Sequence, residues 1–137
     1  MDCVFCKIVK GEIPSQKVYE GEKCIAILDL FPLNKGHVLI LPKDHYEKLV
    51  EIPPEVWQEM TQVAQKVAQG VVKAFNPDGY HLLMNNGEAS GQEIAHAHLH
   101  VIPRFYDDGV KFGWRHLEYG EEEFREYGDR LRQALKG

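Results

Sequence analysis

The sequence predicts an α+β fold: a five-stranded antiparallel meander sheet with one long helix, a short N-terminal helix and a C-terminal helix. Two observations predict it. Short runs of strand-forming residues are separated by connections too short for parallel crossovers, which favours antiparallel pairing. One long segment repeats apolar residues at intervals of three and four, as an amphipathic helix does. We expect the helices to pack on one side of the sheet.

The first part of the chain alternates structured segments with turn formers. Residues 4–9 predict a short helix, which ends before Gly11. Three strand-like runs follow, separated by turn-forming residues, and they cover residues 17–20, 24–30 and 37–41. These connections predict a meander of neighbouring strands.

The second part begins with the long helix, which Pro53-Pro54 opens. Its apolar stripe consists of Val56, Met60, Val63, Val67 and Val71. We expect it to end near Phe75, before the turn formers at 76–79. Two more strands are expected, at 80–84 and 98–104, and a final helix is predicted by the apolar repeat Phe124, Tyr127, Leu131 and Leu135.

Composition limits the function classes. The 137 residues include 44% hydrophobic and 27% charged side chains, as in ordinary globular domains. A net charge of −5 gives no broad electrostatic reason to bind nucleic acid. We expect no membrane partner and a cytoplasmic location, because no apolar run approaches the roughly 20 residues of a bilayer span and no signal peptide is visible. The three cysteines predict thiols or metal ligands rather than disulfides.

Three histidines alternate within five residues: His96, His98 and His100. On a strand they would point to one face. The opposite, apolar face would receive Ala97, Leu99 and Val101. Three interpretations remain: a polar solvent-facing strand, a set of metal ligands, or an imidazole nucleophile that attacks phosphorus. The polar, glycine-containing loop at 85–92 favours phosphate, because backbone N–H groups in such loops can form an anion site.

These features resemble the histidine triad (HIT) family of nucleotide-binding hydrolases and transferases, in its bacterial, Hint-like branch. The resemblance covers nearly all of residues 2–104, and it rests on segments 5–8, 11–14, 27–29, 35–43, 85–87, 91–93 and 96–104. It implies a single histidine triad domain over residues 1–137, with its core at 2–104 and a C-terminal extension at 105–137.

The resemblance also implies a reaction. The family acts as hydrolases or nucleotidyl transferases at the α-phosphate of purine nucleotide phosphoramidates, mixed anhydrides or dinucleoside polyphosphates. By position, His98 would be the nucleophile and form a nucleotidyl-histidine that water cleaves. His100 would contact the phosphate oxygens, and His37 would support the nucleophile from the neighbouring strand. Asn85 and Gln92 would contact the phosphate or the leaving group.

Further positions match the nucleoside site. Asp29 would accept hydrogen bonds from ribose hydroxyls, although it could also simply begin a turn. The resemblance assigns the purine slot to apolar residues that would otherwise be ordinary core, namely Phe5, Ile8, Ile27 and Leu39. One position departs from the family, because Glu93 stands where Ser or Thr usually follows the glutamine. A carboxylate beside a phosphate is repulsive unless it is turned away, protonated or paired.

A Cys-x-x-C pair, Cys3 and Cys6, has no second pair in the chain. Bacterial members that resemble this chain place a structural zinc on a Cys, Cys, His, His set, which His45 and His96 would complete. Such a zinc would hold the N-terminal segment to the sheet and take no part in the chemistry, which needs no metal. The alternatives are two free thiols, or Cys24 as a third ligand, although Cys24 fits the core better.

Two rival functions remain: a nucleotide-binding or interaction module with little turnover, and a metal-dependent hydrolase in which His96, His98 and His100 hold the catalytic metal.

The family typically forms homodimers, and the long striped helix could supply an interface. Family C-terminal residues often reach the active site across the dimer. Trp114 is the candidate for that role here, with a buried anchor for the last helix as the alternative.

Overall fold

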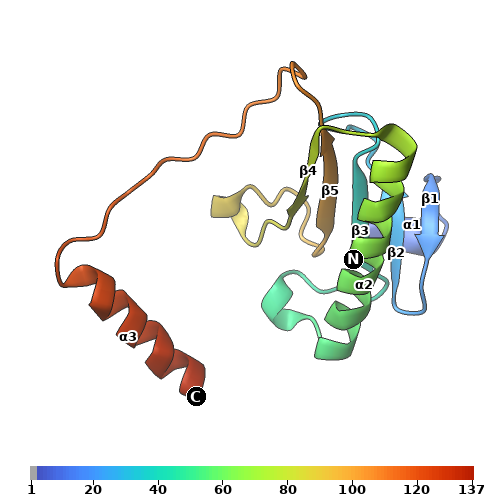
Figure 1. Ribbon diagram of the computed structural model, residues 1–137. Helices are drawn as coiled ribbons and strands as arrows, with labels where there is room; N and C mark the ends of the chain where they lie inside the picture. Colours follow the sequence, from blue (N-terminus) through green and yellow to red (C-terminus); the bar gives the residue numbers. More distant parts are fainter. Residues whose placement is uncertain (1–2) are drawn as a thin grey trace.

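The computed structural model describes residues 3–137. Its elements, in chain order, are α1 (Val4–Val9), β1 (Lys17–Glu20), β2 (Cys24–Leu28), β3 (Val38–Pro42), η1 (Leu49–Glu51), α2 (Pro54–Phe75), β4 (Gly79–Leu83), η2 (Glu88–Ser90), β5 (Leu99–Arg104) and α3 (Glu123–Lys136) (Figure 1). The predicted α+β fold with five antiparallel strands and three helices is confirmed. No helix in this range is long and apolar enough to cross a membrane.

The strand order is β1-β2-β3-β5-β4. Only the first three strands follow a simple meander, because β5 pairs with both β3 and β4 and lies between them. Helix α2 lies in the connection from β3 to β4. After this helix the chain forms the edge strand β4, and β5 then fills the position between β3 and β4. In this register Leu39 lies opposite His100, which brings the start of β3 beside the histidine segment.

The two faces of the sheet have separate cores. On one face, α2 packs with Val56, Met60 and Val63 against alternate strand residues such as Ala26 and Ile40. The opposite face buries Phe5 of α1 against the intervening strand residues Ile25, Ile27, Leu39 and Leu41. The expectation that the helices share one side was wrong, because the strands of β2 and β3 are apolar on both faces and both need cover.

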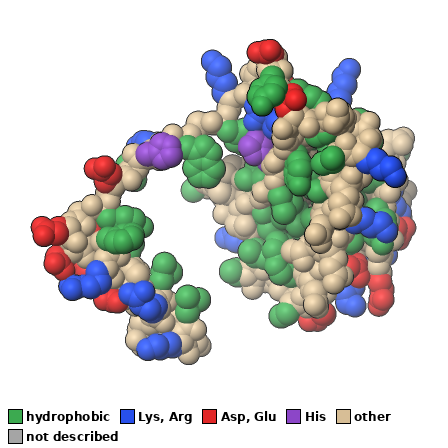
Figure 2. Space-filling view, in the orientation of Figure 1, with side chains coloured by type: hydrophobic (Ala, Val, Ile, Leu, Met, Phe, Trp, Pro, Cys, Tyr) green, Lys and Arg blue, Asp and Glu red, His purple; other side chains and the backbone are tan. Residues whose placement is uncertain are grey.

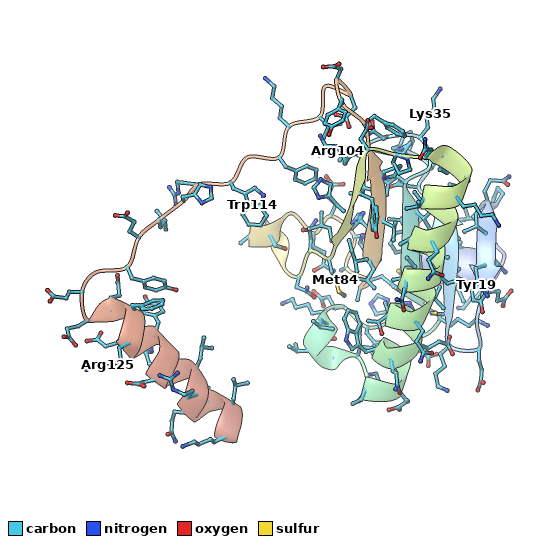
Figure 3. All side chains as sticks on the ribbon, in the orientation of Figure 1. Tyr19, Lys35, Met84, Arg104, Trp114 and Arg125 are labelled. Atoms are coloured by element: carbon cyan, nitrogen blue, oxygen red, sulfur yellow. The ribbon has the colours of Figure 1, made fainter. Side chains whose placement is uncertain are left out.

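Residues 105–137 form an arm that leaves the end of β5 and extends away from the sheet (Figure 1). Its helix α3 covers the predicted C-terminal segment, but none of its residues is buried. Trp114 lies on the extended part of the arm (Figure 3) and is 84% exposed. The alternative of a buried tryptophan that anchors the last helix is therefore wrong for this chain taken alone.

Candidate active site

The histidine segment meets the sheet at the start of β5. His96 and His98 precede the strand, and only His100 lies within it, so the strand predicted to begin at 98 begins one residue later. The side chains still face the α1 side. The ring of Phe5 makes edge contacts with the rings of His96 and His98, at centroid distances of 5.7 and 5.0 Å. The predicted apolar partners pack on the α2 side, and these are Ala97, Leu99 and Val101.

His98 has a fixed tautomer. Its Nδ1–H donates to the carbonyl oxygen of His96 at 2.7 Å, and a carbonyl can only accept. The lone pair of the neutral ring is therefore on Nε2. No hydrogen bond from residues 3–137 reaches Nε2, and since every buried side-chain nitrogen or oxygen of these residues has a partner, Nε2 is open to solvent. The ring as a whole is only 7% exposed.

His37 and His100 form a hydrogen-bonded chain beside His98. The backbone N–H of Leu33 donates to Nδ1 of His37 at 3.1 Å, which places the His37 proton on Nε2. That Nε2–H donates to Nδ1 of His100 at 2.9 Å. The His100 proton must then lie on Nε2, where it can donate to an incoming group. His37 thus supports His100 directly, whereas the family resemblance implied support of the nucleophile.

Burial keeps these rings neutral. It lowers the pKa of His98, although the carbonyl of His96 opposes the shift. It also lowers the pKa of His37, against the attraction of Asp29. Burial, with His98 and His37 as positive neighbours when protonated, lowers the pKa of His100 to about 4. At neutral pH the site therefore offers an unprotonated nitrogen on His98 and a neutral N–H donor on His100.

Asp29 has two different carboxylate oxygens. Oδ1 accepts from the backbone N–H of Phe31 at 3.0 Å, which is the local turn that the sequence left as an alternative. Oδ2 lies 3.7 Å from Nε2 of His37. Asp29 is partly exposed, so a carboxylate acceptor remains at the edge of the histidine chain.

The loop ahead of the histidines uses four of its own backbone N–H donors internally. The backbone N–H of Gly87 donates to Oε1 of Gln92 at 2.7 Å. The N–H groups of Ser90, Gly91 and Gln92 donate to carbonyls of Gly87 and Glu88. These four amides therefore do not form the expected anion site, since the turn itself satisfies them.

Gln92 braces this loop. Its Nε2 donates to the carbonyls of Glu47 and Ile94, at 2.8 and 3.1 Å. Both amide hydrogens are then engaged, and none remains for a phosphate. Asn85 is partly buried and close to Gly91, while Glu93 is exposed and turned to solvent rather than buried beside the histidines.

The residues expected to hold the purine lie together. Phe5, Ile27 and Leu39 are each at most 4% exposed and belong to one apolar cluster, against which Ile8 packs. The cluster borders His98 through Phe5. As the sequence allowed, these residues also form the core between α1 and the sheet.

Four side chains form a second cluster on the other side of Phe5, here called the Cys/His cluster: Cys3, Cys6, His45 and His96. Sγ of Cys3 lies 3.4 Å from Nδ1 of His96, and the two Nδ1 atoms of His45 and His96 are 3.2 Å apart. A tetrahedral zinc with bonds of about 2.3 Å to sulfur and 2.0–2.1 Å to nitrogen separates neighbouring ligand atoms by about 3.3–3.8 Å. The separations fit such an ion.

The tautomer of His96 fits a metal as well. Its Nε2–H donates to the carbonyl oxygen of Pro42 at 2.9 Å, so the lone pair is on Nδ1, which faces the cysteines. Cys24 takes no part. It is fully buried in the α2 core, where burial and the neighbouring Glu59 raise the pKa of its thiol to about 12. The Cys/His cluster can therefore bind a metal ion.

A catalytic metal on His96, His98 and His100 is contradicted by the structure. Within residues 3–137, His96 belongs to the Cys/His cluster and His98 belongs to no metal-type cluster. The solvent-facing interpretation is also wrong, because His96 and His98 are buried. Asp29, His37 and His100 do lie close together. However, Nδ1 of His37 already accepts the Leu33 N–H, so a metal on Nε2 would require that hydrogen bond to break.

No signal in the sequence identifies the groups that set the proton positions. These are backbone atoms: the carbonyls of Pro42 and His96 and the N–H of Leu33. Any residue type supplies them, so only the path of the chain could reveal them. The bracing role of Gln92 was equally hidden, although its place in a polar loop marked it as functional.

An open imidazole nitrogen beside a fixed N–H donor defines a class of site that can attack an electrophilic centre and stabilise the charge that develops. The chain belongs to the HIT domain family, whose match spans residues 10–107.

Two relatives have named activities. Adenosine 5′-monophosphoramidase hnt1 of Schizosaccharomyces pombe is 36% identical over 137 residues, which cover 99% of this chain and 100% of that protein. Adenylylsulfatase HINT3 of Arabidopsis thaliana is 50% identical over 103 residues, which cover 75% of this chain and 52% of that protein.

Two solved structures extend the similarity to the whole fold. A member of the HIT family from Bacillus subtilis is 37% identical, with a TM-score of 0.92 over 97% of this chain and 96% of that chain. A Zn-bound histidine triad family protein from Mycobacterium smegmatis is 37% identical, with a TM-score of 0.74 over 99% of this chain and 97% of that chain.

Proposed function

We propose that the chain hydrolyses purine nucleotide conjugates at the α-phosphorus through a covalent intermediate on His98. The observation that carries the proposal is the Nδ1–H bond from His98 to the His96 carbonyl, which leaves Nε2 unprotonated and accessible. The phosphoramidase and adenylylsulfatase relatives support this chemistry, because both names describe cleavage of a nucleotide from a group on its phosphate.

The reaction has two steps. Nε2 of His98 attacks the α-phosphorus, the N–P bond forms, and the bond to the leaving group breaks with its electron pair, which takes up a proton from solvent. Water then attacks the same phosphorus and gives up a proton to solvent, the N–P bond breaks with its electron pair returning to Nε2, and nucleoside monophosphate is released with His98 restored. His100 donates its Nε2–H to a phosphoryl oxygen in both steps, which stabilises the charge that develops there.

The nucleoside is held on the α1 side of the sheet. The apolar cluster around Phe5, Ile27 and Leu39 borders the purine, and Oδ2 of Asp29 accepts from a ribose hydroxyl. Asn85 contacts the phosphate or the leaving group. Gln92 acts by fixing the loop, because its donors are engaged.

A structural zinc occupies the Cys/His cluster in this proposal. The four ligand atoms and the Nδ1 lone pair of His96 fit zinc, and the Mycobacterium smegmatis relative is a Zn-bound protein. Four protein ligands leave no open position, so the ion holds α1 to the sheet and activates no water. Metal analysis of protein purified without chelator should find about one zinc per chain. A Cys3→Ser/Cys6→Ser variant with unchanged zinc content would contradict zinc binding by the Cys/His cluster.

We also propose that the chain acts in the cytoplasm, as a homodimer, and as one domain with core 2–104 and extension 105–137. Three free cysteines support a reducing compartment. The dimer is supported by apolar side chains exposed on β4 and on the end of α2, which are Val72, Phe75, Tyr80 and Leu82.

The test is single-turnover incubation with an adenosine phosphoramidate, followed by mass analysis of the protein and of the released nucleotide. The wild type should release AMP and carry a transient adenylyl group on His98. His98→Gln should do neither, whereas His116→Gln, which changes an exposed histidine of the arm, should match the wild type. Binding without release would favour the nucleotide-binding module. Adenylylsulfate and a dinucleoside polyphosphate in parallel reactions would rank the leaving groups.

A further inference from the structure

The turn between β2 and β3 controls a proton on which the active site depends. The backbone N–H of Leu33 donates to Nδ1 of His37, and this bond places the His37 proton on Nε2, where it faces His100. Oδ2 of Asp29 is also near that proton, but at 3.7 Å from Nε2 it is beyond hydrogen-bond distance. The position of the Leu33 N–H therefore sets the tautomer of His37.

Asn34 ties this turn to the end of β5. Its backbone carbonyl accepts the N–H of His37 at 3.1 Å. Its side-chain amide donates to the carbonyl oxygen of Pro103 and to Oδ2 of Asp108, both at 2.9 Å. Both amide hydrogens are then engaged. One residue thus connects the backbone of His37 to two acceptors at the far end of the sheet.

Asp108 is the anchor of this connection, and its side chain is only 7% exposed. Its carboxylate accepts from Nε and Nη2 of Arg104 at 2.7 and 3.1 Å, and from the backbone N–H groups of Phe105 and Val110 at 3.0 and 2.9 Å. The Arg104 guanidinium, together with these N–H groups, holds the pKa of the carboxyl well below its usual range. The anchor is therefore a fixed anion that the Asn34 amide can rely on.

The anchor lies outside the part of the chain that carries the histidines. The HIT domain match ends at residue 107, so Asp108 comes just after it, at the base of the arm. Arg104 and Lys35, which Figure 3 labels, lie at the same end of the sheet. Acidic and basic side chains gather there, where the arm leaves the body (Figure 2). The contact between the arm and the 33–37 turn is made within one copy of the chain.

A role in holding the base of the arm alone would not require the bond to Asn34. The bonds from Arg104, Phe105 and Val110 to Asp108 already close the local turn. The Asn34 bond is different in kind, because it crosses to the turn that positions His37.

We propose that Asn34 and Asp108 are positioning residues for the proton of His37. They hold the turn so that the Leu33 N–H stays on Nδ1 of that ring. Without them the His37 proton can move to Nδ1, and Nε2 then accepts from Nδ1–H of His100. In that arrangement Nε2 of His100 carries a lone pair in place of a donor. Only the effect on turnover rests on the proposed function.

The first test reads the ring tautomers without substrate, from long-range ¹H–¹⁵N correlation spectra of histidine-labelled protein at neutral pH. The wild type should carry its protons on Nε2 in both His37 and His100. Asn34→Asp keeps the side-chain shape but loses both N–H donors, and it should give a mixture of tautomers in both rings. Lys35→Gln changes an exposed neighbour in the same turn and should match the wild type. Wild-type tautomers in a folded Asn34→Asp protein would overturn the proposal.

The second test changes the other end of the connection, which also covers a failure of Asn34→Asp to fold. Asp108→Asn replaces an acceptor oxygen with an amide group that cannot accept. It should give the same mixture of tautomers, and it should lower kcat for an adenosine phosphoramidate about tenfold with little change in KM, because a donor to the phosphoryl oxygen is lost in part of the molecules. Asp107→Asn removes the same charge from an exposed neighbour and should match the wild type.

The two readouts separate this proposal from the proposed function. Mixed tautomers in a series that includes an inactive wild type would support the positioning role and contradict the phosphoramidase chemistry. A fall in kcat with unchanged tautomers, or a change in KM alone, would refute the positioning role and leave the chemistry of His98 in place.

Discussion

His96 and His98 lie two residues apart and face the same side of the sheet, yet they have opposite tautomers. His96 donates from Nε2 to Pro42 and keeps its lone pair on Nδ1, toward the cysteines. His98 donates from Nδ1 to His96 and keeps its lone pair on Nε2, toward solvent. The comparison teaches that two backbone carbonyls decide which histidine suits a metal and which suits a nucleophile.

The largest expected effect follows loss of the free nitrogen. His98→Gln should reduce turnover of an adenosine phosphoramidate by at least about 10⁴-fold, because no other group beside the phosphorus can form the intermediate. Steady-state kinetics measures the loss, and the metal content should stay that of the wild type. Residual turnover within tenfold of the wild type would show that His98 is not the nucleophile, against the roles that the tautomers indicate for His98 and His96.

A substitution in the Cys/His cluster tests the metal-binding side of the comparison. His45→Gln removes a ligand of the Cys/His cluster, and we expect it to lose the metal and about 2 kcal/mol or more of the free energy of unfolding. Denaturant unfolding and metal analysis measure both. The folded fraction should still form the adduct on His98. If the adduct disappears while the protein remains folded, the two sites are not separate.

The next effect concerns the proton on His100. His37→Leu removes the donor to Nδ1 of His100 and frees that ring to adopt either tautomer. We expect kcat to fall by about 10²-fold with little change in KM, since a donor to the phosphoryl oxygen is weakened. His37→Gln can still donate through its amide, so it should recover part of kcat. Equal losses in both variants would contradict a donor role for His37.

The smallest effect is on stability. The pKa of His100 is about 4 in the folded protein, below the ordinary histidine value near 6.5. Between these pH values the unfolded chain binds the proton and the folded one does not, so His100 makes stability rise with pH over that range. The wild type should therefore lose about 2 kcal/mol more than His100→Gln between pH 7 and pH 4.5. Parallel pH profiles from urea unfolding would refute this.

Periodicity predicted most of the fold. The bounds of α2 follow from Pro54 and from the apolar stripe that ends before Asn76, and they are correct. The position of β5 between β3 and β4 could not be predicted, because strand order depends on pairing between distant segments. The N-terminal helix was assigned to the wrong face for a related reason. Strands 24–28 and 38–42 are apolar on both sides, so their sequences do not indicate which helix covers which face.

The residues of the site were predicted better than their contacts. Family resemblance named His37, His98 and His100, which the structure brings together. It could not indicate that His37 bonds to His100, or that Gln92 uses both amide hydrogens within its loop. Such details depend on backbone groups, which every residue type carries.

The backbone amide of Leu33 has a consequence for metal selection. A protein that binds a metal through some histidines must keep that metal away from the histidines of its active site. All imidazoles are similar metal ligands, so the type of ligand alone cannot distinguish the two sets. Since the Leu33 N–H occupies Nδ1 of His37, the other nitrogen of that ring carries a proton and cannot bind a cation, whereas Nδ1 of His96 keeps its lone pair toward the cysteines. Through the placement of single hydrogens, the backbone would direct a metal ion to the Cys/His cluster and away from His37.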